Sequence, residues 1–303
     1  MKVLVTGGAG FIGSHVVDLL SQTGYETVIV DNFLSGQREL VPPNIRLYEV
    51  DITSSQISDV FKKEKPDVVI HLAAQVDVSR SIKDPVWDAY QNILGTIRLL
   101  TCSHKYNVKK FIFSSSCAVY GEKDDISIKE TSPIQPLSYY GISKFSSEMY
   151  IQAFNNLHQV PFTILRYANV YGPRQTPKGE GGVISIFFKK VINDKSPFIF
   201  GDGEQTRDFV YVKDVALANV LAINNGANEI FNIGSNTKTS INDLYKMITT
   251  IAKDIPAVYM PAREGDIRYS QLDNTKAASI LGWQPSFDLQ AGLSETFKYY
   301  KPK

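Results

Sequence analysis

The opening residues of the chain read Lys2-Val3-Leu4-Val5-Thr6-Gly7-Gly8-Ala9-Gly10-Phe11-Ile12-Gly13. A short apolar strand leads into a glycine-rich turn, and the turn leads into a stretch with helical apolar spacing. Glycines at 8, 10 and 13 match one dinucleotide-binding pattern, and glycines at 7, 10 and 13 match a wider-spaced variant. In both patterns the missing Cβ atoms let the backbone approach a pyrophosphate at a helix N-terminus. We therefore predict a dinucleotide-binding loop rather than a turn without nucleotide.

An acidic residue follows this loop at the distance that a dinucleotide site requires. Asp31 lies 24 positions after Gly7, where the second predicted strand ends. A carboxylate there accepts both hydroxyls of an adenosine ribose and repels a 2′-phosphate. This favours NAD over NADP. Arg38 is the one nearby basic residue that could favour NADP, and we interpret it as a surface charge.

Short apolar runs alternate with longer amphipathic stretches through the first two-thirds of the chain. The predicted strands are residues 2–5, 27–30, 46–50, 68–72, 110–114 and 162–166. The predicted helices are, roughly, residues 11–21, 56–63, 86–104 and 141–157. Continuous apolar strands alternating with helices are typical of a parallel sheet covered on both faces. We predict an α/β fold of the Rossmann type, with a doubly wound parallel sheet.

The elements become shorter and more mixed after Asn169. Residues 174–182 are polar and glycine-rich, which fits an ordinary surface connector and a substrate lid equally well. The elements predicted beyond it are helices at 184–193, from 215 and from 241, and strands at 198–201, 209–212 and 231–234. We expect residues 1–168 to form an NAD-binding domain, with a returning strand near 229–234. We expect residues 169–303 mainly to form a smaller mixed α/β lobe that binds the substrate.

The composition excludes several classes of protein. Of the 303 residues, 32 are Lys or Arg and 31 are Asp or Glu, so no overall field attracts nucleic acid or anionic lipid. Cys102 and Cys117 are the only cysteines, too few for a disulfide framework. His71 lies in an apolar run, so we expect a packed, hydrogen-bonded side chain. The four histidines are scattered and do not have the spacing of metal ligands. With no apolar run of eighteen residues and no room for a signal peptide before the first strand, we expect a cytoplasmic protein.

The candidate catalytic residues lie after the fifth predicted strand. That strand ends in Ser114-Ser115-Ser116, and Tyr139-Tyr140-Gly141-Ile142-Ser143-Lys144 follows downstream. Tyr140 and Lys144 are four positions apart and share one face of a helix. An ammonium group nearby favours phenolate, which lowers the pKa of a tyrosine toward that of a useful general base. Such a pair alone usually marks a solvated helix face, but beside a serine and a nucleotide loop it predicts a catalytic site. Tyr139 has Ser143, and no lysine, four positions further on.

Together these segments resemble the extended short-chain dehydrogenase/reductase superfamily and its NAD-dependent epimerase/dehydratase family. The resemblance covers essentially the whole chain and rests on residues 6–13, 114–121, 140–144, 165–174, 201–208 and 263–266. Within the family the chain is most similar to UDP-galactose 4-epimerases and related nucleotide-sugar 4-epimerases. The resemblance implies a tightly held NAD, a C-terminal lobe for a UDP-sugar, and 4-epimerisation through a transient 4-keto sugar. The expected substrates are UDP-glucose and UDP-galactose, together with their N-acetylated counterparts.

Related activities of the family differ at two positions. Nucleotide-sugar 4,6-dehydratases carry an Asp-Glu pair where this chain has Cys117 and Ala118, and UDP-glucuronate decarboxylases carry a Glu at the position of Ala118. Without these acids the 4-keto sugar has no evident group to drive elimination, which favours epimerisation. The alternatives are a 4,6-dehydratase, a UDP-glucuronate 4-epimerase or decarboxylase, and, more remotely, a non-catalytic NAD-binding sensor. A sensor would show an eroded Ser/Tyr/Lys set, whereas the set here is complete.

The resemblance also assigns the site residue by residue. Ser116, Tyr140 and Lys144 are the expected catalytic residues, the first two at the sugar and Lys144 at the nicotinamide ribose. The expected cofactor-binding residues are Gly7, Gly10, Phe11, Ile12, Gly13, Asp31, Asn32, Asp51, Ile52, Leu72, Ala73, Ala74, Asn92, Ser114, Tyr140, Lys144, Tyr167 and Val170. The expected substrate-binding residues are Ser116, Tyr140, Asn169, Phe198, Phe200, Arg207, Arg263, Asp266 and Ser270.

Among these substrate residues, Arg207 and Arg263 match phosphate-binding arginines, whose guanidinium groups suit that geometry. Asn169 matches a donor to the phosphates, and Asp266 is expected at the ribose. The strand 198–200 is expected at the uracil, although an aromatic strand is equally a core strand.

Two further expectations come from the resemblance. The residue seven positions after Arg263 borders the C2 substituent of the hexose, and here it is Ser270, or Tyr269 if the alignment slips by one. A small residue leaves room for an N-acetyl group, so we expect UDP-N-acetylglucosamine to be accepted. The helices predicted at 86–104 and 141–157 pair across a two-fold axis in the family, which implies a homodimer. Alternatively, their apolar faces only cover the sheet.

Overall fold

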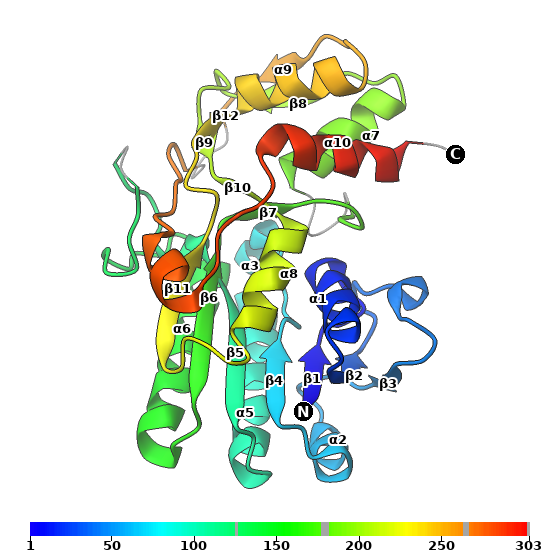
Figure 1. The fold of residues 1–303 in the computed structure, drawn as a ribbon. Coiled ribbons are helices and arrows are strands. Elements are labelled where there is room, and N and C mark those ends of the chain that lie inside the picture. Colours follow the sequence, from blue (N-terminus) through cyan, green and yellow to red (C-terminus); the bar gives the residue numbers. More distant parts are fainter. Residues whose placement is uncertain (125–126, 177–181, 263–266, 302–303) are drawn as a thin grey trace.

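A seven-stranded parallel sheet forms the centre of the structure, a computed structural model that describes residues 1–124, 127–176, 182–262 and 267–301 (Figure 1). In spatial order its strands are β11 (Glu229–Ile233), β6 (Phe162–Tyr167), β5 (Lys110–Ser116), β4 (Val68–His71), β1 (Lys2–Thr6), β2 (Glu26–Asp31) and β3 (Arg46–Glu49). The order reverses between β1 and β4, and such a switch point opens a crevice beyond the carboxyl ends of the strands. The predicted doubly wound parallel sheet is confirmed.

Alternate residues of each strand supply two separate cores, one on each face of the sheet. Val3 and Val5 of β1 pack with α1 (Phe11–Gln22) and α8 (Val212–Leu221). Leu4 packs on the opposite face, where the covering helices are α2 (Ile57–Glu64), α5 (Gly95–Lys105) and α6 (Tyr139–His158). Because successive side chains of a strand point to opposite faces, a strand covered on both sides is apolar at consecutive positions, as β1 is at Val3, Leu4 and Val5.

The helix predicted at residues 86–104 is divided into three parts. Asp84 caps α4 (Pro85–Ala89), its Oδ1 accepting the backbone N–H of Trp87 at 3.0 Å. A π-helical turn, Tyr90–Leu94, then separates α4 from α5. Single π turns are rare and frequently lie at functional sites. The helical stretch predicted at 86–104 is therefore present, and the π turn within it was not predicted.

The remaining elements form a smaller lobe above the carboxyl ends of the sheet strands (Figure 1). Its core is built from α7 (Val183–Ile192), α9 (Ile241–Ile251) and α10 (Leu289–Tyr300). Three short strand pairs connect it: β7 (Asn169–Tyr171) with β10 (Phe209–Tyr211), β8 (Phe198–Phe200) with β13 (Val258–Met260), and β9 (Thr206–Arg207) with β12 (Thr239–Ser240). Strand β11 pairs with β6 in the large sheet. The domain boundary between residues 168 and 169 stays a prediction.

The predicted surface segment 174–182 is described only in part, because residues 177–181 lie outside the described residues. Within the described parts of the chain, every helix is too short or too polar to cross a membrane.

Candidate active site

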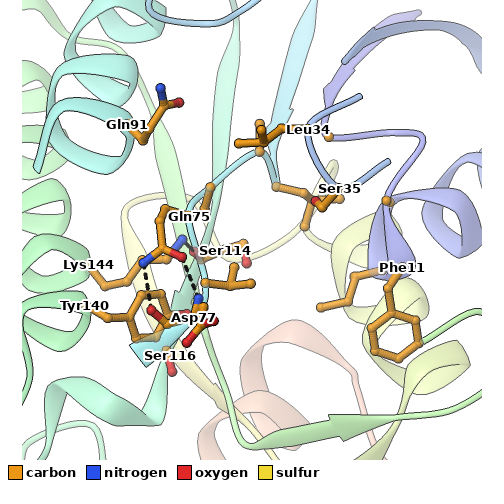
Figure 2. Close-up of a pocket in the computed structure, with 18 of the residues that line it drawn as sticks. Phe11, Leu34, Ser35, Gln75, Asp77, Gln91, Ser114, Ser116, Tyr140 and Lys144 are labelled. Carbon is orange, nitrogen blue, oxygen red and sulfur yellow. Dashed lines mark hydrogen bonds between the residues drawn. The ribbon is translucent and has the colours of Figure 1, made fainter. Parts of the chain in front are cut away.

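A cavity of about 450 Å³ opens beyond the carboxyl ends of the central strands. Most of the expected cofactor and catalytic residues line it. Those on its wall are Gly7, Gly10, Phe11, Ile12, Gly13, Asp31, Asn32, Ile52, Leu72, Ala73, Ala74, Ser114, Ser116, Tyr140, Lys144, Tyr167 and Val170. Figure 2 shows this wall, with Tyr140 and Lys144 of α6 beside Ser114 and Ser116 of β5.

The glycine loop forms one end of the cavity and follows the wider-spaced pattern. Gly7 has φ +71°, and a Cβ there would lie 2.7 Å from the backbone nitrogen of Ala73. A Cβ on Gly13 would lie 2.0 Å from the carbonyl oxygen of Gly7. Gly8 does not line the cavity; its Cα faces the Ile29 side chain in the core. Helix α1 begins at Phe11 without a side-chain cap, so its first backbone N–H groups remain available to an anion. The loop therefore fits a pyrophosphate.

Asp31 lies at the end of β2 with both carboxylate oxygens held by backbone. Its Oδ2 accepts the N–H of Ala9 at 3.0 Å, and its Oδ1 accepts the N–H of Phe33 at 2.8 Å. Burial raises the pKa of Asp31, while these two N–H groups oppose that rise. Arg38, the cation that could favour a 2′-phosphate, forms an ion pair with Glu49. Its guanidinium carbon Cζ lies 4.3 Å from the centroid of the Phe33 ring. The geometry fits ribose hydroxyls better than a phosphate.

Two expected cofactor residues, Asp51 and Asn92, do not line the cavity. Asp51 accepts the Asn32 amide through Oδ2 at 2.8 Å and so fixes a side chain that does line it. Asn92 is buried behind Gln75: its Oδ1 accepts the Gln75 N–H at 2.8 Å, and its Nδ2 donates to the Gln75 carbonyl at 2.9 Å. Both residues support the wall from behind.

The candidate catalytic pair projects from the first turns of α6. Ser138 caps this helix, and the backbone N–H of Tyr140 donates to Ser81 Oγ at 3.1 Å. Lys144 Nζ donates to the carbonyl oxygen of Ser114 at 2.8 Å and lies 5.9 Å from the Tyr140 ring centroid. Burial lowers the pKa of Lys144 to about 8. Tyr139, by contrast, is 48% exposed and lies outside the cavity wall.

The expected substrate residues of the small lobe gather around a second cavity of about 210 Å³. Asn169, Phe198, Phe200 and Arg207 line it. Ser270 is buried and lines neither cavity. Its hydroxyl lies near the Cys117 thiol, and Cys117 follows Ser116 in the chain. Arg263 and Asp266 lie outside the described residues.

Several residues on the wall of the larger cavity were not predicted. They come mainly from the loops after β2 and β4 and from α4, and include Leu34, Ser35, Gln75, Asp77, Trp87 and Gln91. Gln75 and Asp77 bond to each other twice: the Asp77 N–H donates to Gln75 Oε1 at 2.7 Å and Gln75 Nε2 donates to the Asp77 carbonyl at 2.9 Å (Figure 2). These loops have no periodicity or motif, so their position after a strand end is the only signal that the sequence offers.

Comparisons with known proteins agree with this geometry. The model of the NAD dependent epimerase/dehydratase family matches residues 3–234. UDP-glucose 4-epimerase of Mycolicibacterium smegmatis is 38% identical over 312 residues, covering 100% of this chain and 99% of that protein. The crystal structure of UDP-glucose 4-epimerase from Thermotoga maritima with UDP-glucose has a TM-score of 0.97 and 48% identity, covering 99% of this chain and 98% of that one. UDP-N-acetylglucosamine 4-epimerase from Methanobrevibacter ruminantium, in complex with UDP-N-acetylmuramic acid, has a TM-score of 0.94 and 36% identity, covering 99% and 97%.

Proposed function

The chain belongs to the NAD-dependent epimerase/dehydratase family, and we propose that it interconverts UDP-glucose and UDP-galactose by NAD-dependent epimerisation at C4. The observation that carries this proposal is the meeting of three features on one cavity wall: the glycine loop, the Tyr140 and Lys144 pair, and Ser116. Cys117 and Ala118 follow Ser116 in place of acids that would drive elimination. The enzyme is therefore an isomerase rather than a dehydratase.

The larger cavity suits the cofactor. Gly7, Gly10 and Gly13 with the N-terminus of α1 would hold the pyrophosphate, Asp31 the adenosine ribose, and Lys144 the nicotinamide ribose. When bound there, NAD supplies the acceptor and donor for the hydrogen at C4.

The protein's own residues move the proton and hold the substrate. Tyr140 takes the proton of the C4 hydroxyl and later returns it, while the Ser116 hydroxyl holds the same oxygen. The Lys144 ammonium stabilises the phenolate form of Tyr140. Arg207 and Asn169 bind the nucleotide end of the substrate. The hexose can therefore rotate between the two proton transfers without leaving the site.

The proposed reaction is tested by separate incubation with UDP-glucose, UDP-N-acetylglucosamine and UDP-glucuronate, followed by product identification by NMR. We expect UDP-galactose from UDP-glucose. A 4-keto-6-deoxy sugar would identify a dehydratase, and a pentose from UDP-glucuronate would identify a decarboxylase. Bound NAD without turnover of any UDP-sugar would favour a sensor.

We also propose that the N-acetylated substrate is accepted. Ser270 is small and lies beside Cys117, next to Ser116, so a large side chain there would crowd the sugar site. Ser270→Tyr is expected to impair UDP-N-acetylglucosamine selectively, at a cost of about 1–3 kcal/mol as overpacking typically gives. The measurement is kcat/KM for both sugars in the variant and the unaltered enzyme. Equal loss for both sugars would contradict this role of Ser270.

We infer that the enzyme is a homodimer. Apolar side chains stand exposed along α4 and α6, among them Val86, which is 78% exposed, and Ile142, Met149 and Tyr150. Apolar surface of this kind on neighbouring helices typically marks an interface. Sedimentation of the purified protein at micromolar concentration should give a dimer, and Val86→Glu should shift the equilibrium toward monomer. A monomeric unaltered protein would contradict the inference.

We place the enzyme in the cytoplasm. Cys102 and Cys117 are both free thiols, which agrees with a reducing compartment. The net charge of +1 gives no strong electrostatic attraction to nucleic acid, so the UDP-sugar is the expected partner.

A further inference from the structure

Asp88 of α4 is a buried carboxylate that the reaction described above does not use. Its side chain is among the most buried polar groups, at 1% exposure. Its Oδ1 accepts Gln75 Nε2 at 2.8 Å and Asn92 Nδ2 at 3.2 Å, whereas its Oδ2 has no hydrogen-bond partner among the described residues. Both donors are neutral amides. These two contacts hold the carboxylate in place, but neither of them brings a positive charge.

Lys144 is a buried lysine whose hydrogen-bond acceptor carries no full negative charge. It is 3% exposed, and its Nζ donates to a backbone carbonyl, which carries only a partial charge. A buried ammonium is costly unless a counter-charge lies nearby. Removing it from water would otherwise favour the neutral amine, which cannot stabilise the phenolate form of Tyr140.

Several titratable groups lie near Lys144. They differ in whether they carry a negative charge that no other cation already pairs with. His71 of β4 has its Nδ1 and Nε2 on the hydroxyls of Thr6 and Thr96, and burial and the Lys144 charge lower the pKa of His71, so it stays neutral. Glu148, one turn along α6, is bound by Arg166 of β6 through two hydrogen bonds of 2.6 and 3.0 Å. Asp88 has no such cation within 4.0 Å in the described parts of the chain.

A residue of the π turn between α4 and α5 links Asp88 to α6. Asn92, in the middle of this turn, uses one amide nitrogen to contact Asp88 Oδ1 at 3.2 Å and Ser143 Oγ at 3.0 Å. Ser143 is the residue before Lys144. Gln75, which also donates to Asp88, lines the same cavity as Lys144 (Figure 2). A single amide therefore joins the Asp88 carboxylate to Ser143, the residue that precedes Lys144 in α6.

We propose that Asp88 is the counter-ion of Lys144, a positioning residue that keeps the lysine protonated so that Tyr140 can work as a base. The proposal rests on the proposed function for the role of Tyr140. The electrostatics agree: Asp88 and then Glu148 raise the pKa of Lys144 against the lowering caused by burial.

The test replaces Asp88 by asparagine, which keeps an oxygen for Gln75 and Asn92 but removes the charge. Lys144 is titrated directly by NMR in enzyme labelled with ¹³C at lysine Cε and carrying its cofactor, with Lys144→Met to assign the signal. We expect the Lys144 midpoint to fall by about one pH unit in Asp88→Asn, as loss of a neighbouring opposite charge typically gives. Accordingly, kcat on UDP-glucose should match the unaltered enzyme on the acidic side and fall about tenfold on the alkaline side.

Asp84→Asn is the matched control. It removes the same charge one turn earlier on the same helix, but Asp84 is exposed and asparagine is an equally good N-cap. It should leave both the Lys144 midpoint and the kcat profile unchanged. If Asp88→Asn folds poorly, Asp88→Ser supplies the test, because its hydroxyl can still accept one amide without a charge.

An unchanged Lys144 midpoint in a folded Asp88 variant would overturn the proposal, and so would a uniform loss of kcat at every pH. If the unaltered enzyme epimerises no UDP-sugar but the midpoint still falls, the proposed function fails while the counter-ion stands. The NMR titration therefore separates the two claims.

Discussion

Replacing Tyr140 by phenylalanine is expected to lower turnover of UDP-glucose by about 10²–10⁴-fold while leaving NAD bound. The variant keeps the ring beside Lys144 and the backbone N–H that donates to Ser81, and removes only the hydroxyl that transfers the proton. The measurement is kcat by NMR of the products, with nucleotide released from denatured enzyme counted in parallel. Loss of the cofactor together with activity would point to a binding role instead.

Tyr139→Phe provides the matched control for this experiment. Tyr139 precedes Tyr140 in the same helix turn, yet its side chain is half exposed and lies outside the cavity. Its hydroxyl has no part in the proposed chemistry, so this variant should retain nearly full activity. A reversed ranking of the two tyrosines would overturn the assignment of the base.

Replacing Arg166 by methionine should have the largest effect on stability. Arg166 and Glu148 form a buried ion pair between β6 and α6, and the guanidinium also donates to the Tyr120 hydroxyl at 2.8 Å. The same Glu148 accepts the Ser115 hydroxyl at 2.5 Å, so the pair fixes α6 against the strand that carries Ser114 and Ser116. Breaking such a pair leaves an uncompensated charge in the interior, which costs about 3–5 kcal/mol.

Urea denaturation at one protein concentration measures this cost. The double variant Arg166→Met with Glu148→Leu removes both charges and should recover part of the loss, because no buried charge is left unpaired. Arg38→Met, which breaks the exposed pair with Glu49, should hardly move the denaturation midpoint. If the double variant loses more free energy of unfolding than the two single variants lose together, the buried pair does not act in this way.

The sequence predicted those parts of the fold and site that depend on local pattern. The sheet follows from apolar runs, and the Tyr140 and Lys144 pair from a spacing of four in one helix. The glycine loop was predicted, but the choice between Gly7 and Gly8 was not. That choice depends on contacts distant in the sequence: Gly7 packs against the chain after β4, and Gly8 against Ile29 of β2.

The parts that were missed depend on tertiary structure alone. A π turn changes the phase of a helix by one residue, and the apolar spacing of 86–104 contains no mark of it. Asp88 sits in this segment like any polar residue of an amphipathic helix. Its burial follows from the packing of α4 on α6, and its partners Gln75 and Asn92 belong to different elements. Only the assembled fold brings Asp88 near Lys144, the candidate catalytic lysine.

In the proposed reaction, C4 of the hexose is oxidised and reduced again within one site, without elimination. This reaction is tested most directly with UDP-glucose carrying deuterium at C4, converted by the purified enzyme in ordinary water and analysed by NMR. We expect UDP-galactose with the deuterium still at C4, because a cofactor held in the cavity does not exchange the transferred hydrogen with solvent between the two steps. Product with hydrogen at C4, or a 6-deoxy sugar in place of UDP-galactose, would contradict it.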